Sequence, residues 1–97
     1  MVARVVMVQI QPGKTEEAVD IYQDSVVPAA KQQQGFRGAL LLTDPGTDTG
    51  MAVTLWERET DMIAGETSGY YQEQIAKFRT IFGAPPMREH YRVSVQE

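Results

Sequence analysis

The sequence predicts an α+β fold in which four strands form an antiparallel sheet and two helical regions cover one of its faces. Three observations lead to this expectation: four segments have strand-like patterns, two helical stretches separate them, and the strands are apolar on both faces. The order is β-α-β-β-α-β, with strands at Val2–Gln11, Phe36–Thr43, Met51–Glu57 and Glu89–Gln96. Because two helices cover only one side of such a sheet, the second apolar side predicts a further covering partner.

The first strand is followed by a turn and an amphipathic helix. Pro12-Gly13 ends the strand, and Thr15 is a credible N-cap for the helix. The buried stripe is predicted to comprise Ala18, Tyr22, Val26 and Ala29. Pro28 falls inside this pattern, so it should kink the helix or restart it as a first-turn residue. Gly35 closes the segment before the second strand.

The second and third strands form a hairpin around a loop at residues 44–50, which is dense in turn-forming residues. In the second strand, alternation places Phe36, Leu40 and Leu42 on one face. Across the sheet, we expect the helix-facing residues to include Val53, Leu55, Val93 and Val95. We expect the open face to carry Trp56, Thr54, Leu41, Ala39, His90 and Arg92.

The second helical region should form two pieces. Gly65 and Gly69 weaken a continuous helix, and Ser68 can cap the second piece. A strong apolar stripe follows at helical spacing, formed by Tyr71, Ile75, Phe78 and Phe82. Pro85 and Pro86 then stop the helix before the last strand.

Together the elements predict a ferredoxin-like sandwich that forms a single domain over residues 1–97. The simplest cover for the open sheet face is a second copy of the chain, which predicts a homodimer. Two facing sheets would then form a closed barrel. The sheltered space between them is the expected place for a small apolar or aromatic ligand.

Composition excludes several classes of function. The net charge of −4 and the absence of a basic run argue against nucleic acid and anionic membranes as partners. The chain has no cysteine, which excludes disulfides and thiolate chemistry. No secretory signal and no apolar stretch of about 20 residues is present, so a cytoplasmic protein is expected. One His and scattered carboxylates do not suggest a metal site, and we expect no cofactor.

Several local motifs resemble those of a known family. They are the Pro-Gly-Lys turn at residues 12–14, the helix ending Val-Val-Pro-Ala-Ala at 26–30, Gly-Phe-Arg-Gly at 35–38 and Leu-Trp-Glu at 55–57. In this order they resemble the dimeric α+β barrel superfamily, and most of all the antibiotic biosynthesis monooxygenase (ABM) family.

The resemblance implies a homodimer with a cavity between sheet and helices. It also implies either a cofactor-independent monooxygenase acting on aromatics or quinols, or a haem-degrading enzyme. Haem-degrading relatives use an Asn on the first strand and a His on the second helix. This chain has no Asn, and its only His lies on the last strand, so haem degradation is not expected.

Several side chains are candidates for the site. His90 is the candidate general base, because its ordinary pKa lies near neutrality; the alternative is a polar residue at a strand end. Trp56 would wall the cavity and stack on a planar ligand, or pack in the interface. The candidate substrate-binding tyrosines, which could equally be core residues, are Tyr22, Tyr70 and Tyr71. Arg37 and Arg92 could hold an anion or form salt bridges.

The resemblance, together with a sheet face that carries Trp56 and His90, implies a cofactor-independent monooxygenase for a small aromatic or quinol-like substrate. A non-catalytic ligand-binding or sensing dimer needs the same cavity without a proton acceptor. A purely structural dimer and an isomerase of the same superfamily are further alternatives.

Overall fold

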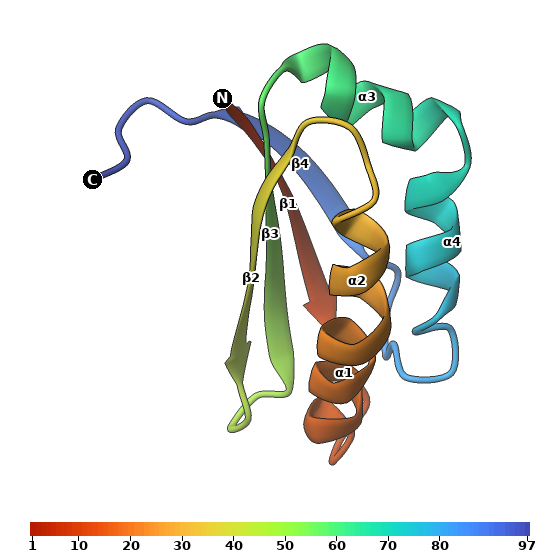
Figure 1. Cartoon of the computed structure of the whole chain (residues 1–97). Helices are drawn as coiled ribbons and strands as arrows, with labels where there is room; N and C mark the ends of the chain where they lie inside the picture. Colours follow the sequence, from red (N-terminus) through yellow and green to blue (C-terminus); the bar gives the residue numbers. More distant parts are fainter.

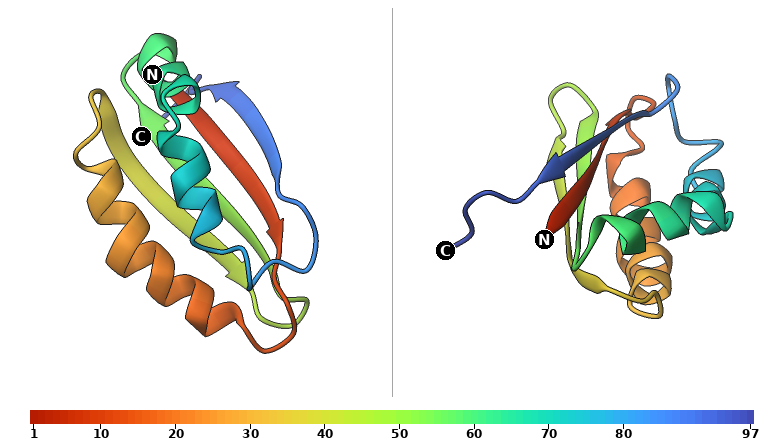
Figure 2. Two further views of the ribbon diagram at one scale, coloured as in Figure 1. Left: turned by 90° about the vertical axis from the view of Figure 1, so that its right-hand side faces the viewer. Right: turned by 90° about the horizontal axis from the view of Figure 1, so that it is seen from above.

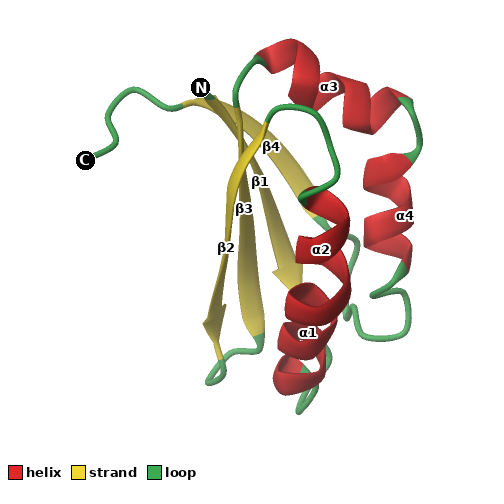
Figure 3. Cartoon of the chain, viewed as in Figure 1, coloured by secondary structure: helices red, strands yellow, loops and turns green.

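Four strands form one antiparallel sheet in the order β2-β3-β1-β4, and every helix lies on the same face of it (Figures 1 and 3). The computed structural model describes all residues, 1–97. The strands are β1 Val2–Gln9, β2 Phe36–Asp44, β3 Thr49–Trp56 and β4 Met87–Arg92. The helices are α1 Thr15–Ile21, the π-helical turn η1 Tyr22–Val26, α2 Val27–Ala30, α3 Glu59–Thr67 and α4 Tyr70–Ala76. The predicted ferredoxin-like βαββαβ fold is confirmed.

The first helix runs continuously through α1, η1 and α2. Pro28 lies in the first turn of α2, which is the second of the two alternatives that the sequence offered. The backbone widens just before it, because the N–H of Val27 donates to the carbonyl of Tyr22 in the π-helical turn. The predicted N-cap is wrong: Lys14 occupies that position, and the Thr15 hydroxyl donates to Asp48 Oδ1 at 2.9 Å instead.

The predicted assignment of the two sheet faces is wrong. Arg4 on β1 lies opposite both Thr54 on β3 and His90 on β4, so these three residues share a face, and helices cover that face. All six residues expected on the open face lie on this covered side, by register with β1 and β3. Val53 and Leu55 lie on the uncovered side, because they alternate with Thr54.

Apart from Phe36 and Val95, the sorting of the strand residues into two groups was correct, and the side that the helices take was reversed. Both groups are rich in apolar residues, so alternation alone did not identify the covered side. Val95 meets no helix at all, because it lies in the C-terminal tail and is 83% exposed. Figure 2 shows this tail leaving the sheet.

A β-bulge in β2 accounts for one further difference. Phe36 pairs with Trp56, whereas Gly38 pairs with Leu55, so Arg37 is an extra residue in β2. Because of this extra residue, Phe36 lies on the covered face, whereas Leu40 lies on the bare face; the two were predicted to share a face. Phe36 then meets the Trp56 ring edge-on at 5.7 Å between ring centroids.

The second helical region divides as expected. Gly69 separates α3 from α4 with a φ of 92°, a left-handed conformation that glycine adopts without strain. The Ser68 hydroxyl accepts a hydrogen bond from the Tyr70 N–H at 3.3 Å, at the start of α4. This break allows α4 to turn and lie along the sheet beside the first helix (Figure 1).

The two faces of the sheet differ in cover. Seen from above, the helices lie on one side and leave the other bare (Figure 2). Met7, Leu40, Leu42, Met87 and Tyr91 alternate onto the bare side, and each is about half exposed or more. The bare face is therefore apolar. None of the helices has the length and apolar character needed to cross a bilayer.

Candidate functional site

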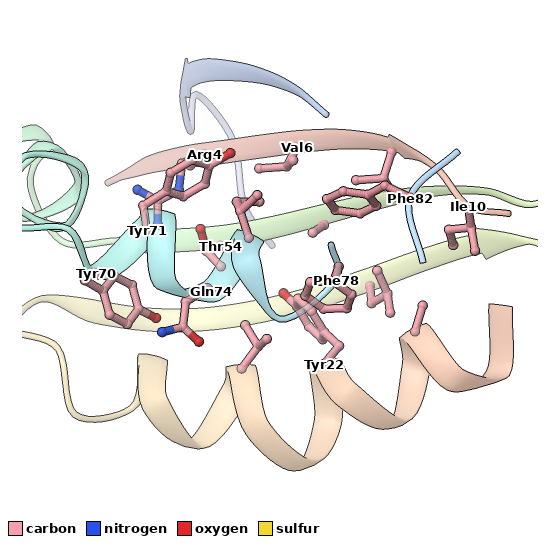
Figure 4. A pocket seen from close by; sticks show the side chains of 16 residues that line it. Arg4, Val6, Ile10, Tyr22, Thr54, Tyr70, Tyr71, Gln74, Phe78 and Phe82 are labelled. Atoms are coloured by element: carbon pink, nitrogen blue, oxygen red, sulfur yellow. The ribbon is translucent and has the colours of Figure 1, made fainter. Parts of the chain in front are cut away.

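A narrow cavity of about 70 Å³ lies between the covered face of the sheet and the helices (Figure 4). Side chains from β1, β2, β3, the first helix, α4 and the segment after α4 form its wall. Of the 16 lining residues 13 are hydrophobic, and the polar remainder is Arg4, Thr54 and Gln74. A concave, mostly apolar site with a few converging polar groups is typical of small-molecule binding. The predicted position between two facing sheets differs from this cavity, which a single chain forms.

Arg4 is the charged group of the cavity. It is only 3% exposed, although it carries a full positive charge. Its Nη1 donates to the Met62 carbonyl at 3.2 Å and to Glu66 Oε2 at 3.1 Å. Its guanidinium also lies over two rings, 5.3 Å from the centroid of Trp56 and 4.7 Å from that of Tyr71. These contacts fix the position of the guanidinium at one end of the cavity.

Glu66 on α3 is the anion that balances this charge. Besides Arg4 it contacts Arg88 at 3.5 Å and His90 Nε2 at 2.8 Å, both from β4. The Glu66 side chain is 9% exposed, so these contacts lie largely away from water. One carboxylate thus joins β1, α3 and β4 next to the cavity.

The three predicted tyrosines line the cavity, and burial raises the pKa of each. The pKa of Tyr22 is raised to about 12, mainly by burial and further by Tyr70, while Arg4 opposes the shift. Burial likewise raises the pKa values of Tyr70 and Tyr71 against the lowering effect of nearby arginines. At neutral pH all three hydroxyls are therefore protonated and serve as hydrogen-bond donors rather than bases.

Trp56 lies at the edge of the site. It is 1% exposed and packs beneath the Arg4 guanidinium, while its indole Nε1 donates to Thr54 Oγ1 at 3.0 Å. It supports Arg4 and Thr54, both of which line the cavity, without lining it itself.

The structure places the other predicted residues outside the cavity wall. His90 contacts Glu66 through Nε2 and does not line the cavity. Arg37 binds Glu57 at 3.1 Å, and both side chains are about half exposed. Arg92 is an exposed residue at the end of β4. The structure therefore joins the tyrosines around one cavity and leaves the three basic candidates elsewhere.

Three polar residues of the site were not predicted: Arg4, Glu66 and Gln74. Arg4 carried a signal that could have been used, since it is the one charged residue in the otherwise apolar segment 2–8. Gln74 is buried in the wall and accepts a hydrogen bond from Lys77 at 2.7 Å. Nowhere do three or more His, Asp or Glu side chains converge as they would around a metal ion.

An antiparallel sheet covered on one face by helices, with an apolar cavity between the two layers, defines a small α+β domain of the ferredoxin-like class. The chain belongs to the antibiotic biosynthesis monooxygenase family, whose sequence profile matches residues 1–77. The family predicted from the motifs is confirmed. Among proteins of curated function, none matches this chain.

Solved structures share the fold at low sequence identity. A protein of unknown function from Nitrosomonas europaea, NE2512, is 20% identical with a TM-score of 0.78, covering 99% of this chain and 91% of that one. SnoaB, a cofactor-independent oxygenase from Streptomyces nogalater, is 12% identical with a TM-score of 0.74, over 98% and 94% of the two chains. A monooxygenase of Streptomyces coelicolor, solved with nanaomycin D, is 14% identical with a TM-score of 0.77, over 99% and 91%.

Proposed function

We propose that the chain is a cofactor-independent monooxygenase that oxidises a small aromatic, quinol-like substrate in the cavity between sheet and helices. The observation that carries this proposal is an apolar, aromatic-rich cavity with a buried guanidinium at one end. Family membership supports it, since structural neighbours include a cofactor-independent oxygenase and a monooxygenase bound to nanaomycin D.

The substrate class follows from electron balance. In the oxidation of a hydroquinone to a hydroxyquinone, O2 places one oxygen atom on a ring carbon, and the other leaves as water with two substrate hydrogens. The substrate supplies all four electrons, so no external reductant is needed. Oxidation of a phenol or its anthrone tautomer to a quinone balances in the same way, with one O2 consumed and one water formed, whereas hydroxylation of a phenol to a dihydroxybenzene would require two further electrons.

The substrate must become electron-rich before it meets O2, which requires loss of a phenolic proton. Arg4 favours this step, because a positive charge near a hydroxyl lowers that hydroxyl's pKa. The released proton passes to bulk water, since the cavity wall holds no ordinary proton acceptor. Tyr70 and Tyr71 can donate hydrogen bonds to the resulting anion, whereas the Tyr22 hydroxyl already donates to the Leu40 carbonyl at 3.3 Å. His90, the predicted general base, lies against Glu66 outside the wall, so we expect it not to touch the substrate.

The test is O2 consumption with a panel of hydroquinones and anthrones, with the product identified by mass. We expect turnover by the wild-type protein, little change in His90→Ala, and a large loss in Arg4→Met. A loss of about 100-fold or more in His90→Ala would instead establish His90 as the general base. Absence of turnover across the whole panel would refute the proposal.

The second candidate, a ligand-binding dimer without catalysis, is favoured by one observation. The titratable groups in the cavity wall are an arginine and three tyrosines, none of which is an ordinary proton acceptor at neutral pH. Saturable binding of a hydroquinone without O2 uptake would select this function.

We further propose a homodimer formed through the bare sheet face. The face carries five large apolar side chains that are about half exposed or more, a pattern that marks an interaction surface. Sedimentation equilibrium at micromolar concentration should give the dimer mass. Leu42→Glu should shift the mass toward the monomer. The control Gln23→Glu introduces the same negative charge at an exposed position of the first helix and should leave the mass unchanged. A monomeric wild type would refute the dimer.

A further inference from the structure

The guanidinium of Arg4 has hydrogen-bond donors that the protein does not use. Arginine carries five N–H groups, two on each Nη and one on Nε. Nη1 uses both of its donors, one on the Met62 carbonyl and one on Glu66. Nε and Nη2 have no hydrogen-bond partner in the protein. These two atoms form one edge of the planar fork, which can bind two oxygens side by side.

The unused edge borders open space rather than packed side chains. No fully enclosed side-chain nitrogen or oxygen of this protein lacks a hydrogen-bond partner. Arg4 is itself buried and lines the cavity, so we place its free donors on the cavity side. Trp56 and Tyr71 each lie against the guanidinium through their rings and supply no hydrogen-bond acceptor to that edge.

The charge around this edge favours an anion. Glu66 is the one carboxylate in contact with Arg4, and it also faces Arg88 and His90. The two arginines alone outweigh it by one positive charge. No Asp or Glu lines the cavity, so nothing there would repel a negatively charged ligand.

Space limits the size of the ligand. The cavity measures about 70 Å³, whereas an engineered apolar cavity that accepts benzene measures about 150 Å³. A groove of about 480 Å³ is lined by α4 and the segment after it, and it shares Tyr71, Ile75 and Phe82 with the cavity wall. Displacement of these shared side chains would join the two spaces. A single ring is the smallest substrate of this class, so its entry requires the least displacement of these side chains.

We propose that the substrate is a single-ring hydroquinone bearing a carboxylate, which accepts hydrogen bonds from Nε and Nη2 of Arg4. This inference rests on the proposed oxygenase function and names its substrate class. For 2,5-dihydroxybenzoate the reaction balances, because one molecule of substrate and one of O2 give one hydroxylated benzoquinone carboxylate and one water. A ring C–H is replaced by C–OH, the two phenols become carbonyls, and the carboxylate stays intact on Arg4.

Benzoate tests the carboxylate site without any redox chemistry, with benzyl alcohol as its neutral counterpart. Trp56 is the only tryptophan and lies 5.3 Å from the Arg4 guanidinium, so its fluorescence reports binding at this place. We expect wild-type protein to bind benzoate about tenfold or more tightly than benzyl alcohol, because hydrogen bonds between the guanidinium and a charged carboxylate are stronger than those to a neutral hydroxyl. Equal binding of the two compounds would overturn the proposal.

Two variants test whether Arg4 is the residue that causes the preference for benzoate. Arg4→Met should abolish the preference for benzoate, while Arg37→Gln, a change at an exposed arginine paired with Glu57, should leave it intact. A folded Arg4→Met protein that keeps the preference would also overturn the proposal. If Arg4→Met does not fold, the wild-type comparison of benzoate with benzyl alcohol still decides.

The two proposals fail in different ways. O2 uptake with unsubstituted hydroquinone but no benzoate preference would retain the oxygenase and refute the carboxylate site. Benzoate preference without O2 uptake from 2,5-dihydroxybenzoate would retain the carboxylate site and refute oxidation of this substrate class.

Discussion

The buried Arg4–Glu66 pair leads to an asymmetric prediction about stability. Glu66→Leu leaves the Arg4 charge buried with only the Met62 carbonyl as acceptor. Breaking a buried ion pair in this way costs about 3–5 kcal/mol. Arg4→Met costs less, because the Glu66 carboxylate keeps Arg88 and His90 as partners at 3.5 and 2.8 Å.

The double variant Arg4→Met/Glu66→Leu removes both charges and replaces them with apolar side chains. Such a replacement is often close to neutral, so the double variant should be more stable than Glu66→Leu alone. The coupling free energy should then be at least about 2 kcal/mol, within the range found for groups in contact.

Wild type, the two single variants and the double variant form a double-mutant cycle, and urea unfolding measures the free energy of unfolding of each. All four should be measured at one fixed protein concentration, since the stability of a dimer depends on concentration. With an m value of about 1–3 kcal/mol/M, Glu66→Leu should lower the midpoint by about 1 M or more. The exposed pair Arg37 and Glu57 provides the matched control, with an expected coupling of at most about 1 kcal/mol. Additive costs in the Arg4–Glu66 cycle, or a larger loss from Arg4→Met than from Glu66→Leu, would refute the reasoning.

Two other predictions concern pH and backbone. The pKa of Tyr22 is raised to about 12, so the folded state keeps this proton while the unfolded chain releases it near pH 10. Stability should fall by up to about 3 kcal/mol as the pH rises from 10 to 12, and Tyr22→Phe should reduce this fall in urea unfolding; an unchanged pH profile would contradict it. Gly35→Ala should destabilise more than Gly13→Ala in the same assay, because both glycines have positive φ but only at Gly35 would the new Cβ collide with Asp61. Equal losses at the two positions would show that the collision is relieved at no cost.

The fold could be predicted because its signals are local. The turn at Pro12-Gly13, the first-turn position of Pro28 and the break at Gly69 each depend on the backbone of a few neighbouring residues. Alternation in the strands correctly divided the sheet residues into two sets, except for Phe36 at the bulge. Which set the helices cover depends on contacts between distant elements, and both sets are apolar enough to be buried.

The candidate site could be predicted only in part for the same reason. Tyr22 and Tyr71 were predictable because they stand on helical apolar stripes, where periodicity identifies the buried side. The partnership of Arg4 with Glu66 joins residues 62 positions apart, and no sequence spacing indicates it. The bulge at Arg37 is also invisible to alternation, so the side taken by Phe36 was missed.

The most direct measurement is a crystal structure of the protein with 2,5-dihydroxybenzoate bound in the absence of oxygen. The ring should lie between sheet and helices, with its carboxylate within hydrogen-bond distance of Arg4 Nε and Nη2. A ring held between the bare sheet faces of two copies, or anywhere else outside the Arg4 cavity, would contradict the assignment of this cavity as the substrate site.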